Sequence, residues 1–137
     1  MGKIIIIGAN GAVGKSCASK IADKELVLIS RSGFDDNTSK NPQTLEHILD
    51  LNDYVKTADF INNMDYEISG IIFAIGSISL KPFSNTSVDD FKKLMDDNFY
   101  NIVNFLNLSI NKMAEGSSVV FFSTIAAIRG FKNHTGI

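Results

Sequence analysis

Short apolar runs alternate with segments of helical periodicity along this chain. The runs lie at residues 4–7, 25–30, 45–51, 70–76 and 117–124. The runs at 4–7 and 70–76 are nearly all apolar, the run at 45–51 is less uniformly so, and several of their residues are β-branched, which is typical of strands buried on both faces of a parallel sheet. Helical spacing of apolar residues follows from residue 12, weakly over 53–64, and over 88–113. The alternation predicts an α/β fold: a Rossmann-like, doubly wound parallel sheet in three α/β/α layers.

The first predicted strand leads into a glycine turn within Lys3 to Ser16, KIIIIGANGAVGKS. Gly8, Gly11 and Gly14 fall three residues apart. Glycine at that spacing suits a tight turn, a close backbone approach to a ligand and a close helix–strand contact. Free backbone N–H groups and the helix dipole point at such a turn, so the stretch predicts phosphate binding.

Two phosphate-binding motifs compete for this turn. The spacing GxxGxxG is a variant of the dinucleotide fingerprint, whereas Gly14-Lys15-Ser16 is the GKS that ends a P-loop. A strict P-loop needs glycine where this chain has Ala9. The turn therefore favours a dinucleotide site and leaves a P-loop open.

The residues after the second predicted strand bear on the choice of cofactor. Ser30, Arg31 and Ser32 stand where a nucleotide-binding βαβ unit meets the adenosine ribose. Arginine can bind a 2′-phosphate there, which favours NADP over NAD. A solvated arginine is the alternative, and Asp35 and Asp36 keep NAD open.

Polar residues near three further elements have a functional and a structural interpretation each. Asp50 either contacts adenine at the edge of a cofactor pocket or caps the following helix. Asn98 lies on the apolar stripe of the long helix, where a buried amide must satisfy backbone or join a functional network. Ser123 and Thr124 end the fifth predicted strand, where hydroxyls touch a ligand or cap the strand.

Composition restricts the class of protein. The 137 residues suit one domain, 1–137, with a net charge of −2 and 45% hydrophobic residues. No block of basic residues indicates nucleic acid or a membrane surface, and no leader or spanning segment is evident, so we expect a cytoplasmic location. A single cysteine, Cys17, with His47 and His134 far apart, predicts no metal site.

Laid out in this order, the chain resembles the short-chain dehydrogenase/reductase family along its whole length. GANGAVG is similar to the family's glycine turn, with Ile7 where threonine is more usual and Ala12 where the main subgroup has glycine. FAIG at 73–76 stands where the family has Asn-Asn-Ala-Gly, and only Gly76 clearly agrees. MDDNFYN around Asn98 and GSSVVFFSTIAAIRG around Thr124 resemble two further family segments. No single motif is specific, but their order and spacing are.

The resemblance implies a nicotinamide dinucleotide cofactor, NADP by preference or NAD, and a small-molecule substrate. Asn98 takes the place of the asparagine that supports a proton-relay water, and Thr124 that of the substrate-binding serine; these two are the expected catalytic residues. The expected cofactor-binding residues are Gly8, Asn10, Gly11, Ala12, Val13, Gly14, Ser30, Arg31, Ser32, Asp50, Leu51, Ala74, Ile75 and Gly76.

One departure from the family concerns the chemistry. The family's catalytic tyrosine falls at Ile137, the last residue, and the lysine four further on has no counterpart. Isoleucine cannot donate a proton. We therefore expect the N-terminal portion of a longer domain, lacking its C-terminal strands and inactive by itself.

Three functions remain in order of preference. The first is an NAD(P)(H)-dependent oxidoreductase that moves hydride to or from a small carbonyl or alcohol. The second is a non-catalytic dinucleotide-binding or sensor protein of the same fold, and the third a P-loop phosphotransferase. Four apolar residues lie off the main stripe of the 88–113 helix and are consistent with packing against another subunit, as in a homo-oligomer, or against the absent half of the domain; they are Leu94, Phe99, Val103 and Phe105.

Overall fold

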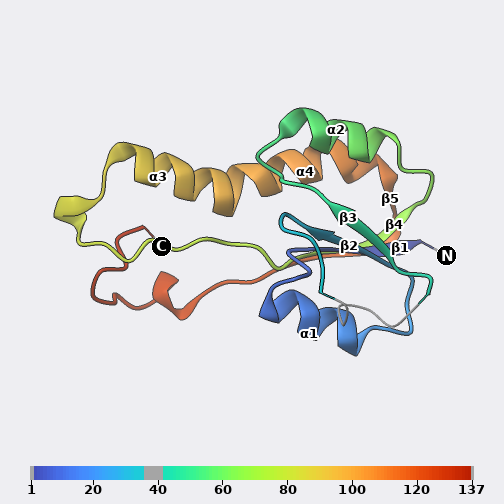
Figure 1. Cartoon of the computed structure of the whole chain (residues 1–137), viewed down its shortest axis with the longest axis horizontal. Helices are drawn as coiled ribbons and strands as arrows, with labels where there is room; N and C mark the ends of the chain where they lie inside the picture. Colours follow the sequence, from blue (N-terminus) through green and yellow to red (C-terminus); the bar gives the residue numbers. More distant parts are fainter. Residues whose placement is uncertain (1, 36–41, 137) are drawn as a thin grey trace.

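A computed structural model describes residues 2–35 and 42–136; part of the predicted 33–43 loop, with Asp36, and the terminal Ile137 lie outside them. Five parallel strands form one sheet in the order β3-β2-β1-β4-β5 (Figure 1). Their bounds are β1 Lys3–Ile7, β2 Leu26–Ser30, β3 Leu45–Ile48, β4 Ile68–Phe73 and β5 Met113–Phe121.

Helices cover both faces of this sheet. Helix α1 (Ala12–Lys20) lies on one face, whereas α2 (Tyr54–Asn62) and α4 (Asn101–Ser109) lie on the other; α3 (Val88–Met95) extends past the sheet (Figure 1). Successive strand residues point to opposite faces. Ile5 and Ile7 accordingly join the core under α2 and α4, and Ile6 joins the core under α1. The predicted three-layer, Rossmann-like α/β fold is confirmed.

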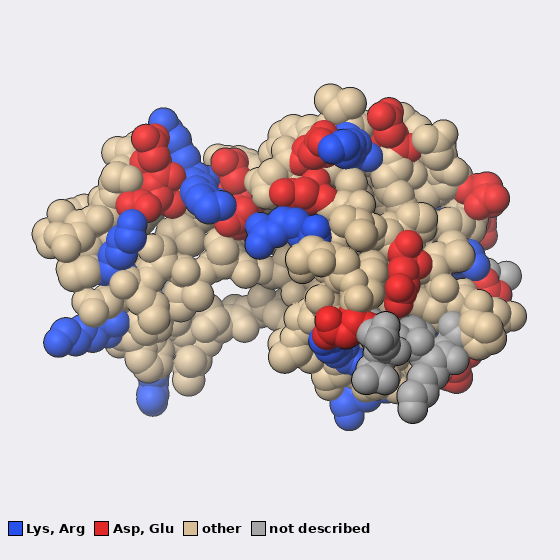
Figure 2. Space-filling model, viewed as in Figure 1, with Lys and Arg blue, Asp and Glu red and all other residues tan. Residues whose placement is uncertain are grey.

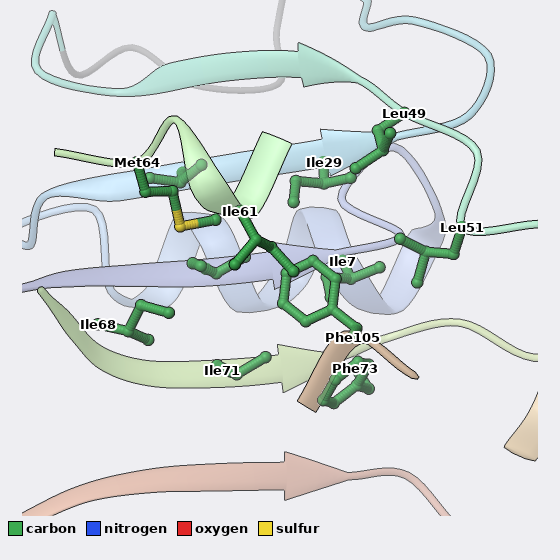
Figure 3. Close-up of a cluster of buried hydrophobic side chains, with 12 residues drawn as sticks. Ile7, Ile29, Leu49, Leu51, Ile61, Met64, Ile68, Ile71, Phe73 and Phe105 are labelled. Carbon is green, nitrogen blue, oxygen red and sulfur yellow. The ribbon is translucent and has the colours of Figure 1, made fainter. Parts of the chain in front are cut away.

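The larger core lies between the sheet and helices α2 and α4. Ile61 of α2 and Phe105 of α4 point toward the strands, where they meet Ile7, Ile71 and Phe73 (Figure 3). Phe73 packs edge-on against Phe105, with ring centroids 5.9 Å apart and planes at 88°. This packing fixes α4 over β1 and β4, and with it the polar residues at the start of α4.

The predicted 88–113 helix is interrupted by a π-helical turn at Asp96–Tyr100, between α3 and α4. Asn101 donates its backbone N–H to Asp96 O, five residues back. The Asn98 side chain donates to Leu94 O at 2.9 Å, a carbonyl that an α-helix would pair with the Asn98 N–H. An inserted side chain of this kind accounts for the irregular turn.

The apolar stripe predicted for the 88–113 helix is confirmed only in part, because Ile102 and Leu106 pack against the core whereas other members are exposed. The predicted members are Val88, Phe91, Met95, Ile102, Leu106 and Ile110. Of its members, Val88, Met95 and Ile110 are 70%, 43% and 56% exposed. Leu94 and Phe105, which the periodicity placed off the stripe, are buried. Each π turn adds about one residue to the repeat, which rotates every later side chain around the axis.

Three strands end earlier than predicted. Ala74 N still donates to Ile7 O at 2.8 Å, but β1 then turns away at Gly8, so β4 loses its neighbour. The residues Asp50, Ala74, Ile75, Gly76, Ser123 and Thr124 consequently lie in loops beyond the carboxyl ends of the strands. Loops at that edge can face a ligand.

Two loop segments continue side by side beyond the sheet toward α3 (Figure 1). Lys81 pairs with His134 as an isolated parallel bridge, and Thr135 Oγ1 donates to Lys81 O at 2.9 Å. Helix α3 begins with a capping box, because Ser87 and Asp90 exchange side-chain and backbone hydrogen bonds. Within the described residues, no helix has the length and apolar character needed to cross a membrane.

Candidate functional site

The three glycines of the turn after β1 have three different structural roles. Gly8 has φ +82°, and a Cβ there would lie 2.3 Å from Ala74 O. A Cβ on Gly14 would lie 2.3 Å from Gly8 O, so Gly14 lets α1 pack directly on the turn. Gly11, the N-cap of α1, has one neighbour, Gly8 O at 3.3 Å from its Cβ position. Gly11 is thus the position left open to a ligand.

A cleft of about 550 Å³ opens from this turn along the carboxyl ends of the strands. Figure 2 shows the molecule hollowed between the sheet and the part formed by α3 and the outer loops, with charged side chains near the opening. Most of the expected cofactor-binding residues meet in this cleft: Gly8, Asn10, Gly11, Ser30, Arg31, Ser32, Asp50, Leu51, Ala74, Ile75 and Gly76.

Three expected cofactor-binding residues are not among the described residues that line the cleft. Ala12, Val13 and Gly14 form the first turn of α1. The side chain of Val13 is 46% exposed. Gly14 is buried against the turn. Its contribution to the site is the packing of the helix.

The GKS sequence lies inside α1 rather than in a phosphate-binding loop. Only four residues, 8–11, separate β1 from α1, which begins before Gly14. The Lys15 ammonium lies 2.5 Å from the Asp35 carboxylate. A P-loop needs a longer loop and a lysine that reaches the phosphates. Lys15 and Ser16 are therefore ordinary residues of the first helix.

A second cleft, of about 670 Å³, adjoins the first and holds both expected catalytic residues, Asn98 and Thr124. The two clefts share Ile75, Gly76 and Ser77, the loop that follows β4. The second cleft has more apolar walls, formed by residues such as Phe73, Ile78, Phe91, Leu94, Met95, Ile102, Phe121 and Phe122. The loop after β4 therefore links a polar cleft to an apolar one.

The Asn98 side chain satisfies backbone groups, which was one of its two predicted roles. Asn98 Oδ1 accepts from Ser77 N at 2.9 Å, while Nδ2 donates to Ser77 O and Leu94 O, both at 2.9 Å. A Cβ on Gly76 would lie 3.0 Å from Asn98 Oδ1. Asn98 thereby holds the shared loop on the helix, and Gly76 makes room for it.

Thr124 lies beyond the end of β5 as the cap of a 3₁₀ turn, Ile125–Ala127. Its Oγ1 accepts from Ala126 N at 3.2 Å. The hydroxyl proton remains available for donation into the cleft, where Ser123 also lies.

Sequence reasoning missed a polar wall that three helix residues, Lys93, Asp97 and Asn101, add to the first cleft. Asp97 Oδ2 accepts from Ser77 Oγ at 2.9 Å and from Lys93 Nζ at 3.2 Å. Spacing by four on one helix was the available signal. This spacing alone did not indicate a binding site, because the face of the helix that meets the cleft depends on the π turn.

The Asp97 carboxyl is ionised at neutral pH. Burial acts to raise its pKa, but hydrogen bonds from Ser77, Lys93 and Asn52, together with the charge of Lys93, outweigh burial and hold the pKa below its usual value. The wall therefore presents a negative charge beside the lysine ammonium.

Two observations test whether a dinucleotide fits the first cleft. Gly11 leaves the backbone at the head of α1 open, as a diphosphate needs. Asn10 Oδ1 is buried and, in the described part of the chain, has no hydrogen-bond partner. An unpaired buried acceptor is costly, and a ligand donor would satisfy it. The turn and the cleft thus suit a nucleotide with a diphosphate.

An open parallel sheet with a glycine turn and a crevice at the strand ends defines the Rossmann-like class of α/β proteins. The family model of the KR domain matches residues 2–136. The chain belongs to this family, which is of the short-chain dehydrogenase/reductase type.

Solved structures share this fold at low sequence identity. The Cj0485 dehydrogenase superposes with a TM-score of 0.88 at 17% identity, over 98% of this chain and 56% of its own. ElxO with NADP bound gives 0.83 at 20% identity, over 98% and 60%. A 4-hydroxyisoleucine dehydrogenase complexed with NADH and succinate gives 0.81 at 17% identity, over 97% and 64%.

These likenesses establish the fold. The chain spans between 56% and 64% of the length of those three proteins. A comparison of the sequence with curated proteins gives no match.

Proposed function

We propose that the chain is the cofactor-binding part of an NAD(P)(H)-dependent oxidoreductase that prefers NADP(H) and acts on a small carbonyl or alcohol. The observation that carries the proposal is the glycine turn with its open position at Gly11, which shares one cleft with Arg31 and Gly76. The bound NADP of one relative and the NADH of another support a nicotinamide dinucleotide.

The proposed placement follows the two clefts. The diphosphate lies at the N-terminus of α1 beside Gly11, whose own N–H donates to Gly8 O at 3.0 Å, and the 2′-phosphate lies at the exposed Arg31. The bound cofactor extends along the loop from Ala74 to Ser77, so that it reaches from the first cleft into the second. Asn98 fixes that loop through both backbone groups of Ser77.

The proposed chemistry takes place in the second cleft. When bound, the nicotinamide supplies or takes up the hydride. Thr124 Oγ1 donates its proton in a hydrogen bond to the substrate carbonyl oxygen and so favours the charge that develops there. The mainly apolar walls of this cleft suit a substrate with an apolar body. Asn98 organises a water for proton transfer, as the family resemblance implies.

A non-catalytic dinucleotide-binding or sensor protein is the second candidate. Ile137, at the position of the family's tyrosine, favours it because isoleucine supplies no proton. Both candidates share the cofactor cleft, and turnover separates them.

We also propose a homo-oligomer through the exposed side of α3 and α4. Phe99 and Val103 are 51% and 45% exposed there, so two of the four residues that first indicated this surface remain available. Leu94 and Phe105 are part of the interior.

Replacing Thr124 by alanine tests the catalytic proposal. Because this chain is expected to be inactive by itself, the assay uses the complete gene product. With a panel of small apolar ketones and NADPH, we expect the variant to lose about 100-fold in kcat/KM, since one donor to a developing oxyanion is worth about that much. Oxidation of the reduced nicotinamide, followed by its absorbance, measures the rate. NADPH affinity should stay constant, because Thr124 lies outside the first cleft.

The conservative variant Thr124→Ser keeps the hydroxyl and should retain most of the activity. Equal rates for Thr124→Ala and the unchanged protein would remove Thr124 from the mechanism. Binding of NADPH without turnover of any substrate would favour the sensor.

A further inference from the structure

Ser77 lies where the two clefts meet, and its hydroxyl proton is already engaged. The residue lines both clefts, as Ile75 and Gly76 do. Ser77 Oγ donates to Asp97 Oδ2 at 2.9 Å. Because the ionised carboxylate of Asp97 can only accept, the serine has to be the donor. Within the described residues no group donates to Ser77 Oγ, so its lone pairs are left to accept a hydrogen bond from a ligand.

The contacts around Ser77 hold this polarity in place. Lys93 Nζ donates to the same carboxylate oxygen, Asp97 Oδ2, at 3.2 Å, and the Asp97 side chain is only 12% exposed. A nearby ammonium favours the charged form of a carboxyl group. Asn98 separately binds the backbone N–H and the carbonyl of Ser77, both at 2.9 Å. The serine hydroxyl therefore has a fixed position and turns its proton away from the second cleft.

Thr124 presents the opposite polarity to the second cleft. Thr124 Oγ1 accepts from Ala126 N at 3.2 Å, and its hydroxyl proton has no acceptor in the described part of the chain. Asn98 adds no donor, because its amide group donates to the carbonyls of Ser77 and Leu94. The cleft thus offers a donor at Thr124 and an acceptor at Ser77.

Two further hydroxyls line the second cleft, those of Ser123 and Thr135. Thr135 Oγ1 donates to Lys81 O at 2.9 Å, whereas Ser123 is free to donate or to accept. Ser77 differs from both by its place in the loop that joins the clefts. In the proposed function, on which this inference rests, the nicotinamide enters the second cleft along that loop. A substrate group that meets Ser77 is therefore close to the carbon that exchanges hydride.

We propose that Ser77 is a specificity-determining residue that accepts a hydrogen bond from a hydroxyl group next to the reacting carbonyl of the substrate, and that Asp97 is its positioning residue. The substrate class is then a hydroxyketone, or a vicinal diol in the reverse direction. The carbonyl oxygen accepts from Thr124 while the neighbouring hydroxyl donates to Ser77. A ketone without that hydroxyl leaves the serine oxygen unpaired, and a site built for a hydroxyl disfavours it for this reason.

α-Hydroxyacetophenone and α-methoxyacetophenone are a matched pair of probes for this assignment. Both carry an oxygen next to the carbonyl and an aromatic body that suits the apolar walls, but only the first can donate. With the complete gene product and NADPH, we expect kcat/KM to be at least about fivefold higher for the hydroxyketone. The dissociation constants of the two ketones, measured by ligand-observed NMR with NADP⁺ bound, should differ in the same direction without any reduction of the carbonyl.

Two variants separate the acceptor from the residue that orients it. Ser77→Ala should abolish the preference for the hydroxyketone in both measurements. Asp97→Ala should lower it at least about twofold, because the serine proton can then turn toward the cleft. A general loss of structure weakens both ketones together and leaves their ratio unchanged, since specificity is a difference of affinities.

Ser79→Ala and Asp96→Ala are the matched controls. Each removes the same group from the same loop or the same helical turn, at a residue that is not among those lining either cleft. Both should leave the preference unchanged.

Equal values for the two ketones in the unchanged protein overturn the inference and leave the proposed function intact. The same holds if Ser77→Ala keeps the preference, or if Ser123→Ala abolishes it instead. An unchanged preference in Asp97→Ala overturns the positioning role of Asp97. Failure to bind NADPH overturns the proposed function itself.

Discussion

Replacing Gly14 by alanine is expected to cost about 3 kcal/mol or more of the free energy of unfolding. The new Cβ would lie 2.3 Å from Gly8 O and 2.7 Å from the Ala9 Cα, both of them backbone atoms. Helix α1 would have to move off the turn, since neither atom can rotate away. The gain of about 1 kcal/mol in helix propensity from glycine to alanine does not compensate. Chemical denaturation measures the change.

Two glycine variants serve as controls for this loss. At Gly130 an added Cβ meets nothing within 4 Å, so Gly130→Ala should unfold like the unchanged protein. Gly11→Ala should likewise keep most of its stability but weaken cofactor binding, because its Cβ occupies the open side of the turn. Equal stability of Gly14→Ala and Gly130→Ala would contradict the packing role of Gly14.

Replacing Arg31 by alanine is expected to weaken NADPH binding about 100-fold and to change NADH binding little. A guanidinium bound to a phosphate contributes charge-assisted hydrogen bonds worth about 1.5–3 kcal/mol, and NADH lacks the 2′-phosphate. Arg31 lines the first cleft after β2, where the ribose is proposed to lie. Parallel titrations of the two cofactors give both dissociation constants.

Arg129→Ala removes an exposed arginine that is not among the residues lining either cleft, and should leave both affinities unchanged. Equal losses for NADPH and NADH in Arg31→Ala would mean that Arg31 does not read the 2′-phosphate. The preference for NADP would then have to be abandoned, although a dinucleotide site would remain.

The local parts of the fold could be predicted from the sequence. Ile4 to Ile7 formed the central strand because a β-branched run buried on both faces has few other solutions. The spacing of Gly8, Gly11 and Gly14 predicted a tight turn, an open backbone and a packing contact. Gly8 has the positive φ of a turn, Gly11 has the most open surroundings of the three, and Gly14 packs against the turn. Each of these features depends on residues close together in the chain.

Features that depend on distant residues could not be predicted. The carboxyl end of β4 was placed too late because β4 ends where the neighbouring strand β1 turns away at Gly8. The π turn depends on Asn98 bonding both Leu94 and Ser77, which is 21 residues away. Periodicity assumes a regular helix, so it placed Phe105 outside the core.

The candidate site was likewise predicted where it depends on local sequence and missed where it depends on distant contacts. Arg31, Asp50 and Gly76 were found because they stand directly after strands, and strand ends meet at one edge of a parallel sheet. Asp97 and Asn101 were missed because they lie on a helix, where the sequence does not indicate which residues reach the ligand-binding edge of the sheet. Their membership of the cleft depends on how α4 packs through Phe105 onto β4.

The most direct test of the central claim is a calorimetric titration of the protein with NADPH, NADH and magnesium ATP. The glycine turn, Arg31 and the two linked clefts predict one NADPH per chain, weaker binding of NADH, and no binding of ATP. Binding of magnesium ATP without either dinucleotide, or no binding of any of the three, would contradict the dinucleotide site.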